Sequence, residues 1–144
     1  MTKRLPKENI IYAGAWCERK GENYLAEALL DFKQEIELTT AGAYKEEVYR
    51  IIPSLRDSNV KLNIFGYLNR RKLSQLLCSH KIFIFPSLSE GSARVIFEAM
   101  ANGCCILTTM NSGSIVKHKE NGLIFKAGSS IAIKTSIREI LSKT

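Results

Sequence analysis

Two glutamates and the small residues between them form the most informative pattern in the chain. Glu90 and Glu98 lie eight positions apart and bracket Gly91-Ser92-Ala93. The apolar run 82–85 before them, followed by Pro-Ser, predicts a buried strand. We therefore expect Glu90 in the loop at the carboxyl end of that strand and Glu98 about two turns into the next helix. Ligands of an open parallel sheet bind outside the carboxyl ends of its strands, so the pattern predicts one extended ligand held at two points.

The predicted helix start between the two acids favours a phosphate. The first N–H groups of a helix have no partner within the helix, and the helix dipole is positive there. Residues 91–93 lack bulk, so a phosphate can reach these donors. A pyrophosphate also needs a cation opposite it, for which we nominate Lys20 in the loop after the first strand, with Arg19 or Arg94 as helpers. The alternative is that Lys20 is a solvated lysine at the start of a helix.

Ionised carboxylates repel phosphate, so Glu90 and Glu98 must face other groups. Eight residues at the helical rise separate two positions by roughly 12 Å, and helical side chains lean back toward the N-terminus. That span suits a nucleotide diphosphate-sugar, in which hydroxyl-rich rings lie on both sides of a pyrophosphate. A carboxylate accepts hydrogen bonds from two vicinal hydroxyls. The alternative is that Glu98 caps or pairs locally while Glu90 satisfies the helix dipole.

The rest of the chain alternates apolar runs with segments of helical periodicity. Continuous apolar strands alternating with helices indicate a parallel sheet covered on both faces, and hence an α/β, doubly wound, Rossmann-like fold of about six strands. Gly14, Gly42 and Gly66 end the first three strands, where a turn without a side chain can approach a ligand or a neighbouring element. The predicted strands are 9–14, 36–42, 60–66, 81–85, 104–108 and 122–125, and the predicted helices are 21–33, 45–52, one capped by Asn69, 92–102 and 131–141.

Length and composition indicate one globular domain. The chain has 144 residues, of which 45% are hydrophobic and 24% are charged. No apolar stretch approaches the roughly 18 residues of a membrane helix, so we expect a cytoplasmic location. Cys17, Cys78, Cys104 and Cys105 have the spacing of neither a zinc site nor a disulfide framework, so we expect reduced thiols and no metal.

The net charge of +7 admits nucleic acid, an anionic membrane surface or a phosphorylated ligand. The basic residues are scattered and no aromatic ladder is interleaved with them, which argues against nucleic acid. The chain also lacks a Gly-x-Gly-x-x-Gly motif, a Walker lysine loop and the histidines of a Ser/His/Asp triad. A small phosphorylated ligand and an anionic membrane surface therefore remain as the predicted partners.

The segment Phe85-Pro86-Ser87-Leu88-Ser89-Glu90-Gly91, followed by Phe97-Glu98-Ala99-Met100-Ala101-Asn102-Gly103, resembles the donor-site signature of the retaining GT-B glycosyltransferases of the group 1 family. The first strand and its loop (11–21), the strand ending in Phe65-Gly66-Tyr67 and the late turn 120–124 are similar too. The likeness covers nearly the whole chain in the same order.

The resemblance implies that residues 1–144 are a single C-terminal nucleotide-sugar-binding domain, one half of a GT-B architecture whose N-terminal acceptor domain is absent from this chain. It implies a hexosyl-type transferase that moves a sugar from a nucleotide diphosphate-sugar to a glycan or lipid-linked acceptor in cell-surface polysaccharide synthesis. It also implies that no metal or other cofactor is needed, and that the isolated domain turns nothing over. A lipid-linked acceptor would bring the basic surface to the inner face of the membrane as a peripheral contact.

The resemblance also assigns roles to individual residues. Glu98 would hold the ribose hydroxyls, and Glu90 would be the catalytic residue at the transferred sugar. Lys20 would neutralise the diphosphate, and the base would lie on the main chain of Gly66-Tyr67-Leu68. The remaining donor-binding residues would be Gly14, Arg19, Gly91, Ser92, Ala93 and Arg94.

Three features depart from the family pattern. Ala15 stands where the family often has an arginine, which removes one phosphate ligand unless Arg19 replaces it. Ser92-Ala93 replaces a common Phe-Gly pair, and the loop 111–116 lacks the usual acid, both as in a subgroup of the same family. Ala15 favours the alternative of a degenerate, non-catalytic nucleotide-binding module on the same fold.

Overall fold

The computed structural model describes residues 10–16, 21–33, 35–88, 94–110, 116, 118, 120 and 122–142. Within these ranges six parallel strands form one sheet in the order β3-β2-β1-β4-β5-β6. The strands are β1 (Ile10–Ala13), β2 (Ile36–Ala41), β3 (Val60–Ile64), β4 (Ile82–Phe85), β5 (Cys105–Thr109) and β6 (Gly122–Phe125). Every residue of β1 and β4 is buried, as expected of central strands with helices on both faces.

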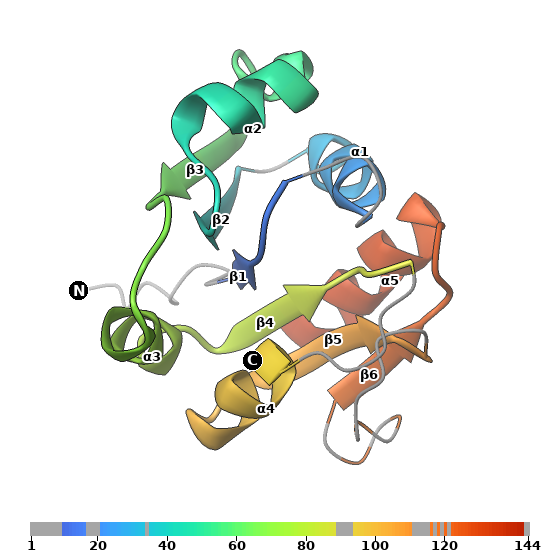
Figure 1. The fold of residues 1–144 in the computed structure, drawn as a ribbon. Coiled ribbons are helices and arrows are strands. Elements are labelled where there is room, and N and C mark those ends of the chain that lie inside the picture. The colour runs from blue at the N-terminus through green and yellow to red at the C-terminus, as the bar shows by residue number, and fades with distance from the viewer. Residues whose placement is uncertain are drawn as a thin grey trace, which may run out of the picture.

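Helices cover both faces of this sheet, which confirms the predicted doubly wound fold. Figure 1 shows α1, α2 and α5 on one face, and α3 and α4 on the other. Helix α1 packs against α5 on the first face, and α3 packs against α4 on the second. The helices are α1 (Glu22–Leu30), α2 (Lys45–Ile51), α3 (Arg70–Cys78), α4 (Arg94–Ala101) and α5 (Ser130–Leu141), with a 3-10 helix, η1 (Pro53–Leu55), after α2.

The strand order reverses between β1 and β4. The chain runs outward from β1 through β2 to β3, crosses back to β4 beside β1, and then runs outward again through β5 to β6. In such sheets the loops after the two central strands diverge and leave a crevice outside their carboxyl ends. The predicted site segments, 14–20 after β1 and 86–93 after β4, are the connections that follow these two strands.

Several helix ends follow from single polar side chains. Asn69 caps α3 as predicted, because its Oδ1 accepts the N–H of Lys72 at 2.8 Å. Ser129 caps α5 in the same way at 3.1 Å, so α5 begins one residue before the predicted start at the first apolar residue. The predicted start of the helix at Ser92 lies outside the described residues.

Other boundaries move by a few residues. Helix α1 ends at Leu30 rather than 33, and β5 spans 105–109 rather than 104–108. Pro53 ends α2 as predicted, and it also starts η1, which the sequence did not predict. Among the described helices none is long and apolar enough to cross a membrane.

Candidate functional site

Three glycines that end neighbouring strands contact one another at the carboxyl edge of the sheet. The N–H of Gly42 donates to the carbonyl of Gly66 at 2.7 Å. A Cβ on Gly42 would lie 2.7 Å from the carbonyl oxygen of Gly14, closer than real Cβ contacts allow. These glycines therefore permit the strand ends themselves to approach closely. The surface beside the crevice consists of backbone at this point.

The loops after β1 and β4 also touch. Gly21 adopts φ +86° at the start of α1, and a Cβ there would lie 2.0 Å from the carbonyl oxygen of Pro86. Only glycine fits this conformation and this distance without a shift. Gly21 directly follows Lys20 in the sequence.

A buried carboxylate lies directly after Gly21 in the sequence. Glu22 is fully buried in the first turn of α1, and the hydroxyl of Tyr12 in β1 lies 2.9 Å from its Oε2. Nearby, the indole N–H of Trp16 donates to Thr40 Oγ1 at 2.8 Å. Sequence reasoning missed Glu22, because an acid in the first turn of a helix normally faces solvent and satisfies the dipole. Here it joins the start of α1 to the central strand.

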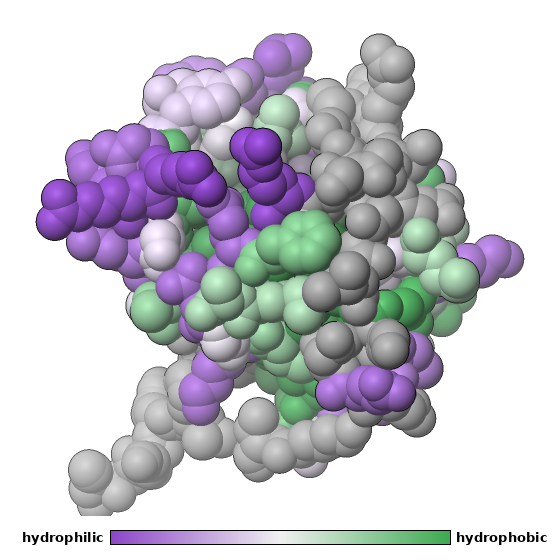
Figure 2. Space-filling view, turned by 60° about the horizontal axis from the view of Figure 1, so that its bottom comes forward, coloured by the Kyte–Doolittle hydropathy of each residue, from purple (hydrophilic) through white to green (hydrophobic). Residues whose placement is uncertain are grey.

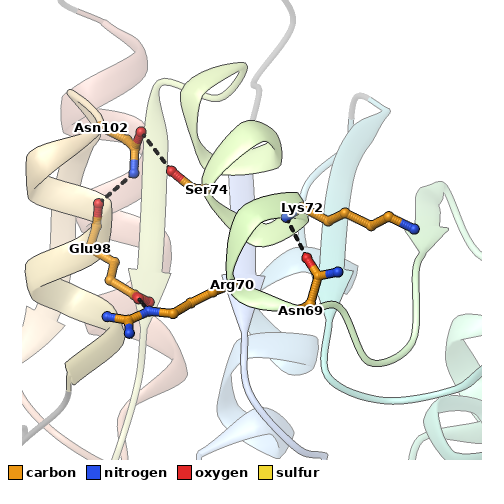
Figure 3. Close-up of polar contacts among 6 residues, drawn as sticks. All are labelled: Asn69, Arg70, Lys72, Ser74, Glu98 and Asn102. Carbon is orange, nitrogen blue, oxygen red and sulfur yellow. Dashed lines mark hydrogen bonds and ion pairs between the residues drawn. The ribbon is translucent and has the colours of Figure 1, made fainter.

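Glu98 lies on α4 and faces the start of α3 (Figure 3). Its Oε2 is 3.3 Å from Nε of Arg70, the first residue of α3, and 27% of the Glu98 side chain is exposed. Glu98 therefore has an ion-pair partner, but this partner lies 28 positions away on the neighbouring helix and is not the local cap or pair that was the alternative. Arg70 is 79% exposed, so solvent screens the pair and the carboxylate remains accessible.

A second polar contact joins the same two helices one turn further on. Ser74 Oγ donates to Asn102 Oδ1 at 3.3 Å, and Asn102 Nδ2 donates to the backbone carbonyl of Glu98 at 2.8 Å (Figure 3). The pairs Arg70–Glu98 and Ser74–Asn102 are thus spaced four residues apart along both segments, with Asn102 directly after the end of α4. They hold Glu98 against the helix that begins directly after the loop 65–69.

The remaining described site residues lie on or beside this edge. Tyr67 and Arg94 are exposed, Leu68 is half-buried and Gly66 is buried. Arg70 follows Leu68 by two positions, so the predicted base loop and the predicted ribose ligand Glu98 are brought together through Arg70. The other predicted residues, Arg19, Lys20, Glu90, Gly91, Ser92 and Ala93, lie outside the described residues.

Hydrophobic and hydrophilic side chains separate on the face that carries α3 and α4. Figure 2 brings the bottom of Figure 1 forward and shows a hydrophobic area in the middle of this face, with strongly hydrophilic side chains on the side of α3. Arg70, Arg71 and Lys72 at the start of α3 are all exposed. Positive charge therefore lies next to Glu98 at the sheet edge where the site was predicted.

The described cysteines lie away from this edge. Cys78, Cys104 and Cys105 carry reduced thiols, as predicted, whereas Cys17 lies outside the described residues. Burial raises the pKa of Cys104 to about 11, and the neighbouring Cys78 and Cys105 add to the shift. Across the described ranges no group of three His, Cys, Asp or Glu side chains is placed to hold a metal ion.

Comparisons with known proteins agree with the fold. The family model described as "Glycosyl transferases group 1" matches residues 7–143. None of the curated protein sequences matches the chain. Anabaena Alr3699/HepE, solved in complex with UDP and glucose, superposes with a TM-score of 0.75 at 20% identity, over 92% of this chain and 39% of that one.

Two further structures are similar. Sucrose-phosphate synthase from Thermosynechococcus elongatus has a TM-score of 0.80 at 23% identity, over 96% of this chain and 37% of its own. The C-terminal domain of LpcC, a glycosyl transferase group 1 family protein from Francisella tularensis, has a TM-score of 0.75 at 21% identity, over 96% and 77%. All three share the fold, and the chain spans less than half the length of the first two.

Proposed function

The chain belongs to the group 1 glycosyl transferases, and we propose on that basis that it forms the donor-binding half of a retaining, hexosyl-type enzyme. The donor is a nucleotide diphosphate-sugar, and the acceptor is a glycan or a lipid-linked glycan of cell-surface polysaccharide synthesis. The chain on its own binds the nucleotide without turning it over, because the acceptor is bound by a separate N-terminal domain.

The observation that carries this proposal is the position of Glu98. Its carboxylate is partly exposed at the carboxyl edge of the sheet, beside the base loop and next to the strand-order reversal. A carboxylate there accepts hydrogen bonds from the two ribose hydroxyls. In the structure one of its oxygens, Oε2, contacts Arg70 instead. The ion pair orients the carboxylate until a ribose reaches it.

The other roles follow the order of the chain. Lys20, assisted by Arg19, neutralises the diphosphate at the contact between Gly21 and Pro86, and the N–H groups of residues 91–93 bind the same phosphates. Glu90 faces the transferred sugar. The cation and the helix dipole stabilise the departing diphosphate, so this proposal assigns no step to a metal.

Calorimetry of the purified chain with UDP, GDP and ADP tests the proposal. We expect one diphosphate to bind, its binding to be abolished in Glu98→Ala and to be weakened in Lys20→Ala. The matched control is Glu27→Ala, which removes an exposed acid from the middle of α1 on the other face of the sheet. A folded wild-type chain that binds none of the three nucleotides would refute a donor-binding function.

A degenerate nucleotide-binding module is the second candidate. Ala15 is exposed directly after Gly14, so the first loop offers no side-chain cation at that position. Under this alternative the full two-domain protein binds a nucleotide and transfers nothing. Hydrolysis or transfer of the sugar by the full-length protein, measured as release of the nucleoside diphosphate, separates the two candidates.

The basic surface leads to a further part of the proposal. A net charge of +7 attracts the chain to an anionic bilayer that carries lipid-linked acceptors, as a peripheral contact at the inner face of the membrane. We expect binding to vesicles that contain phosphatidylglycerol at low salt and its loss at high salt, measured by co-sedimentation. Equal binding to neutral vesicles would contradict an electrostatic contact.

A further inference from the structure

Two tyrosines from different loops form an exposed ring pair at the carboxyl edge of the sheet. Tyr44 follows β2 and precedes α2, and Tyr67 follows β3. Their ring centroids are 5.4 Å apart at an interplanar angle of 62°, an edge-to-face arrangement. Tyr44 is 50% exposed and Tyr67 is 64% exposed, so neither ring belongs to the core.

The backbone around the ring pair is fixed. The two loops are joined by the hydrogen bond from Gly42 to Gly66, and the N–H of Tyr44 donates to Glu47 Oε1 at 2.8 Å. Gly66 adopts φ +72°, and a Cβ there would lie 2.3 Å from Cε1 of Tyr44. The ring of Tyr44 therefore lies directly against the backbone of the loop that carries Tyr67. A ring surface held in this way loses little freedom when it binds a flat ligand.

The ring pair lies at the distance from the strand-order reversal that a nucleoside spans. Neighbouring strands are about 4.8 Å apart, so the ends of β2 and β3 lie on the order of 5 and 10 Å from the end of β1. A diphosphate at the crevice between β1 and β4 places its ribose and base along this edge. Arg70, three residues after Tyr67, contacts Glu98, so the loop that carries Tyr67 leads directly to the residue that contacts the proposed ribose ligand.

We propose that the base of the donor nucleotide stacks on the Tyr44–Tyr67 ring pair. This rests on the proposed function and adds to it, because side chains of two loops then bind the base, in addition to the main chain of residues 66–68. In an edge-to-face pair the edge of one ring covers one face of the other, so the ring that contributes its edge keeps a face open to a base. Base–aromatic stacking accepts every base, since each has a π-face. The ring pair therefore supplies affinity, and the choice between bases is left to hydrogen bonds.

Calorimetry with UDP, GDP, ADP and inorganic pyrophosphate tests the ring pair in the intact chain. Tyr67→Ala should weaken the nucleotide that binds best by roughly 5- to 150-fold, the range expected for loss of one stacked base. Tyr44→Ala should weaken it less, because Tyr44 is the less exposed ring of the pair. Tyr67→Phe should retain the affinity, because the ring is kept. Pyrophosphate binding should change by less than about twofold in all variants, since it has no base to stack.

The control is Tyr49→Ala, which removes a ring from α2, the helix that follows Tyr44. The Tyr49 ring is not part of the ring pair, because it packs against the guanidinium of Arg56, 4.5 Å from the ring centroid. If the wild-type chain binds a nucleotide and both Tyr67→Ala and Tyr44→Ala bind it with unchanged affinity, the ring-pair proposal is overturned and the proposed function is left intact. An equal loss of pyrophosphate binding would also overturn it, because it would indicate a distorted loop. Absence of nucleotide binding by the wild-type chain would overturn both proposals together.

Discussion

Replacing Gly21 by alanine tests whether the loops after β1 and β4 contact each other as the structure has them. Gly21 adopts φ +86°, where an L-residue costs roughly 1–2 kcal/mol, partly offset by about 0.4–1 kcal/mol from the less flexible unfolded chain. The new Cβ would also lie 2.0 Å from the carbonyl oxygen of Pro86 and 2.9 Å from its carbonyl carbon. These are backbone atoms, so one loop must move.

The size of the effect follows from these two contributions. Moving a packed segment to admit one methyl group costs about 1–3 kcal/mol. Together with the backbone conformation, Gly21→Ala should lower the free energy of unfolding by about 2–4 kcal/mol. The matched control is Gly103→Ala, because Gly103 has φ +87° but nothing within 4 Å of the position that a Cβ would take. Gly103→Ala should therefore cost only the conformational part, about 1 kcal/mol.

Urea unfolding of the wild type and both variants measures the difference. We expect the same m-value in all three and a lower midpoint for Gly21→Ala than for Gly103→Ala. Because Lys20 precedes Gly21, the shift should also weaken nucleoside diphosphate binding in Gly21→Ala and leave it unchanged in Gly103→Ala. Free energies of unfolding that agree within about 0.5 kcal/mol would refute the close contact between the two loops.

Three further predictions concern single side chains. In the full-length enzyme, Glu90→Gln should leave nucleotide affinity nearly unchanged while it lowers the rate of sugar transfer, and equal loss of both would contradict the role assigned to Glu90. Arg70→Ala should change the free energy of unfolding by less than about 1 kcal/mol, because its pair with Glu98 is largely solvent-screened, and a loss above about 2 kcal/mol in urea unfolding would argue against that. Burial raises the pKa of Cys104 to about 11, so the folded state holds the thiol proton more tightly than the unfolded state. The free energy of unfolding should therefore fall as pH rises from about 9 toward 11, by at most about 2–3 kcal/mol. Cys104→Ala should lose less stability than the wild type between pH 7.5 and 10.5, and parallel losses in the two proteins would contradict this origin.

The features that sequence reasoning predicted correctly depend on nearby residues. The cap at Asn69 was predictable because a carboxamide oxygen accepts the N–H three residues on, whatever surrounds the helix. The strands were predictable because continuous apolar runs must be buried on both sides. The boundary at Ser129 was missed because the first apolar residue, rather than the hydroxyl before it, was used to start the helix.

The features that were missed depend on how distant segments pack. The pair between Arg70 and Glu98 joins residues 28 positions apart, and it forms only because α3 and α4 lie side by side on one face of the sheet. The burial of Glu22 likewise requires the hydroxyl of Tyr12 from a neighbouring strand. Neither contact leaves a periodic signal in the sequence. The same is true of the ring pair, whose two members come from loops that only the sheet brings together.

The contacts among the strand-end glycines limit how this edge can be diversified. A side chain on Gly42 meets the backbone of Gly14, so relief has to come from a movement of the neighbouring strand end rather than from a rotamer. A side chain on Gly14 would instead meet the ring of Tyr12, but the backbone of Gly14 is also what a side chain on Gly42 would meet, so the two effects should be non-additive. Mutant libraries aimed at a new donor preference would do best to leave Gly14, Gly42 and Gly66 invariant. Tyr44 and Tyr67 are the positions of this edge at which side chains can be exchanged while the backbone beneath them stays in place.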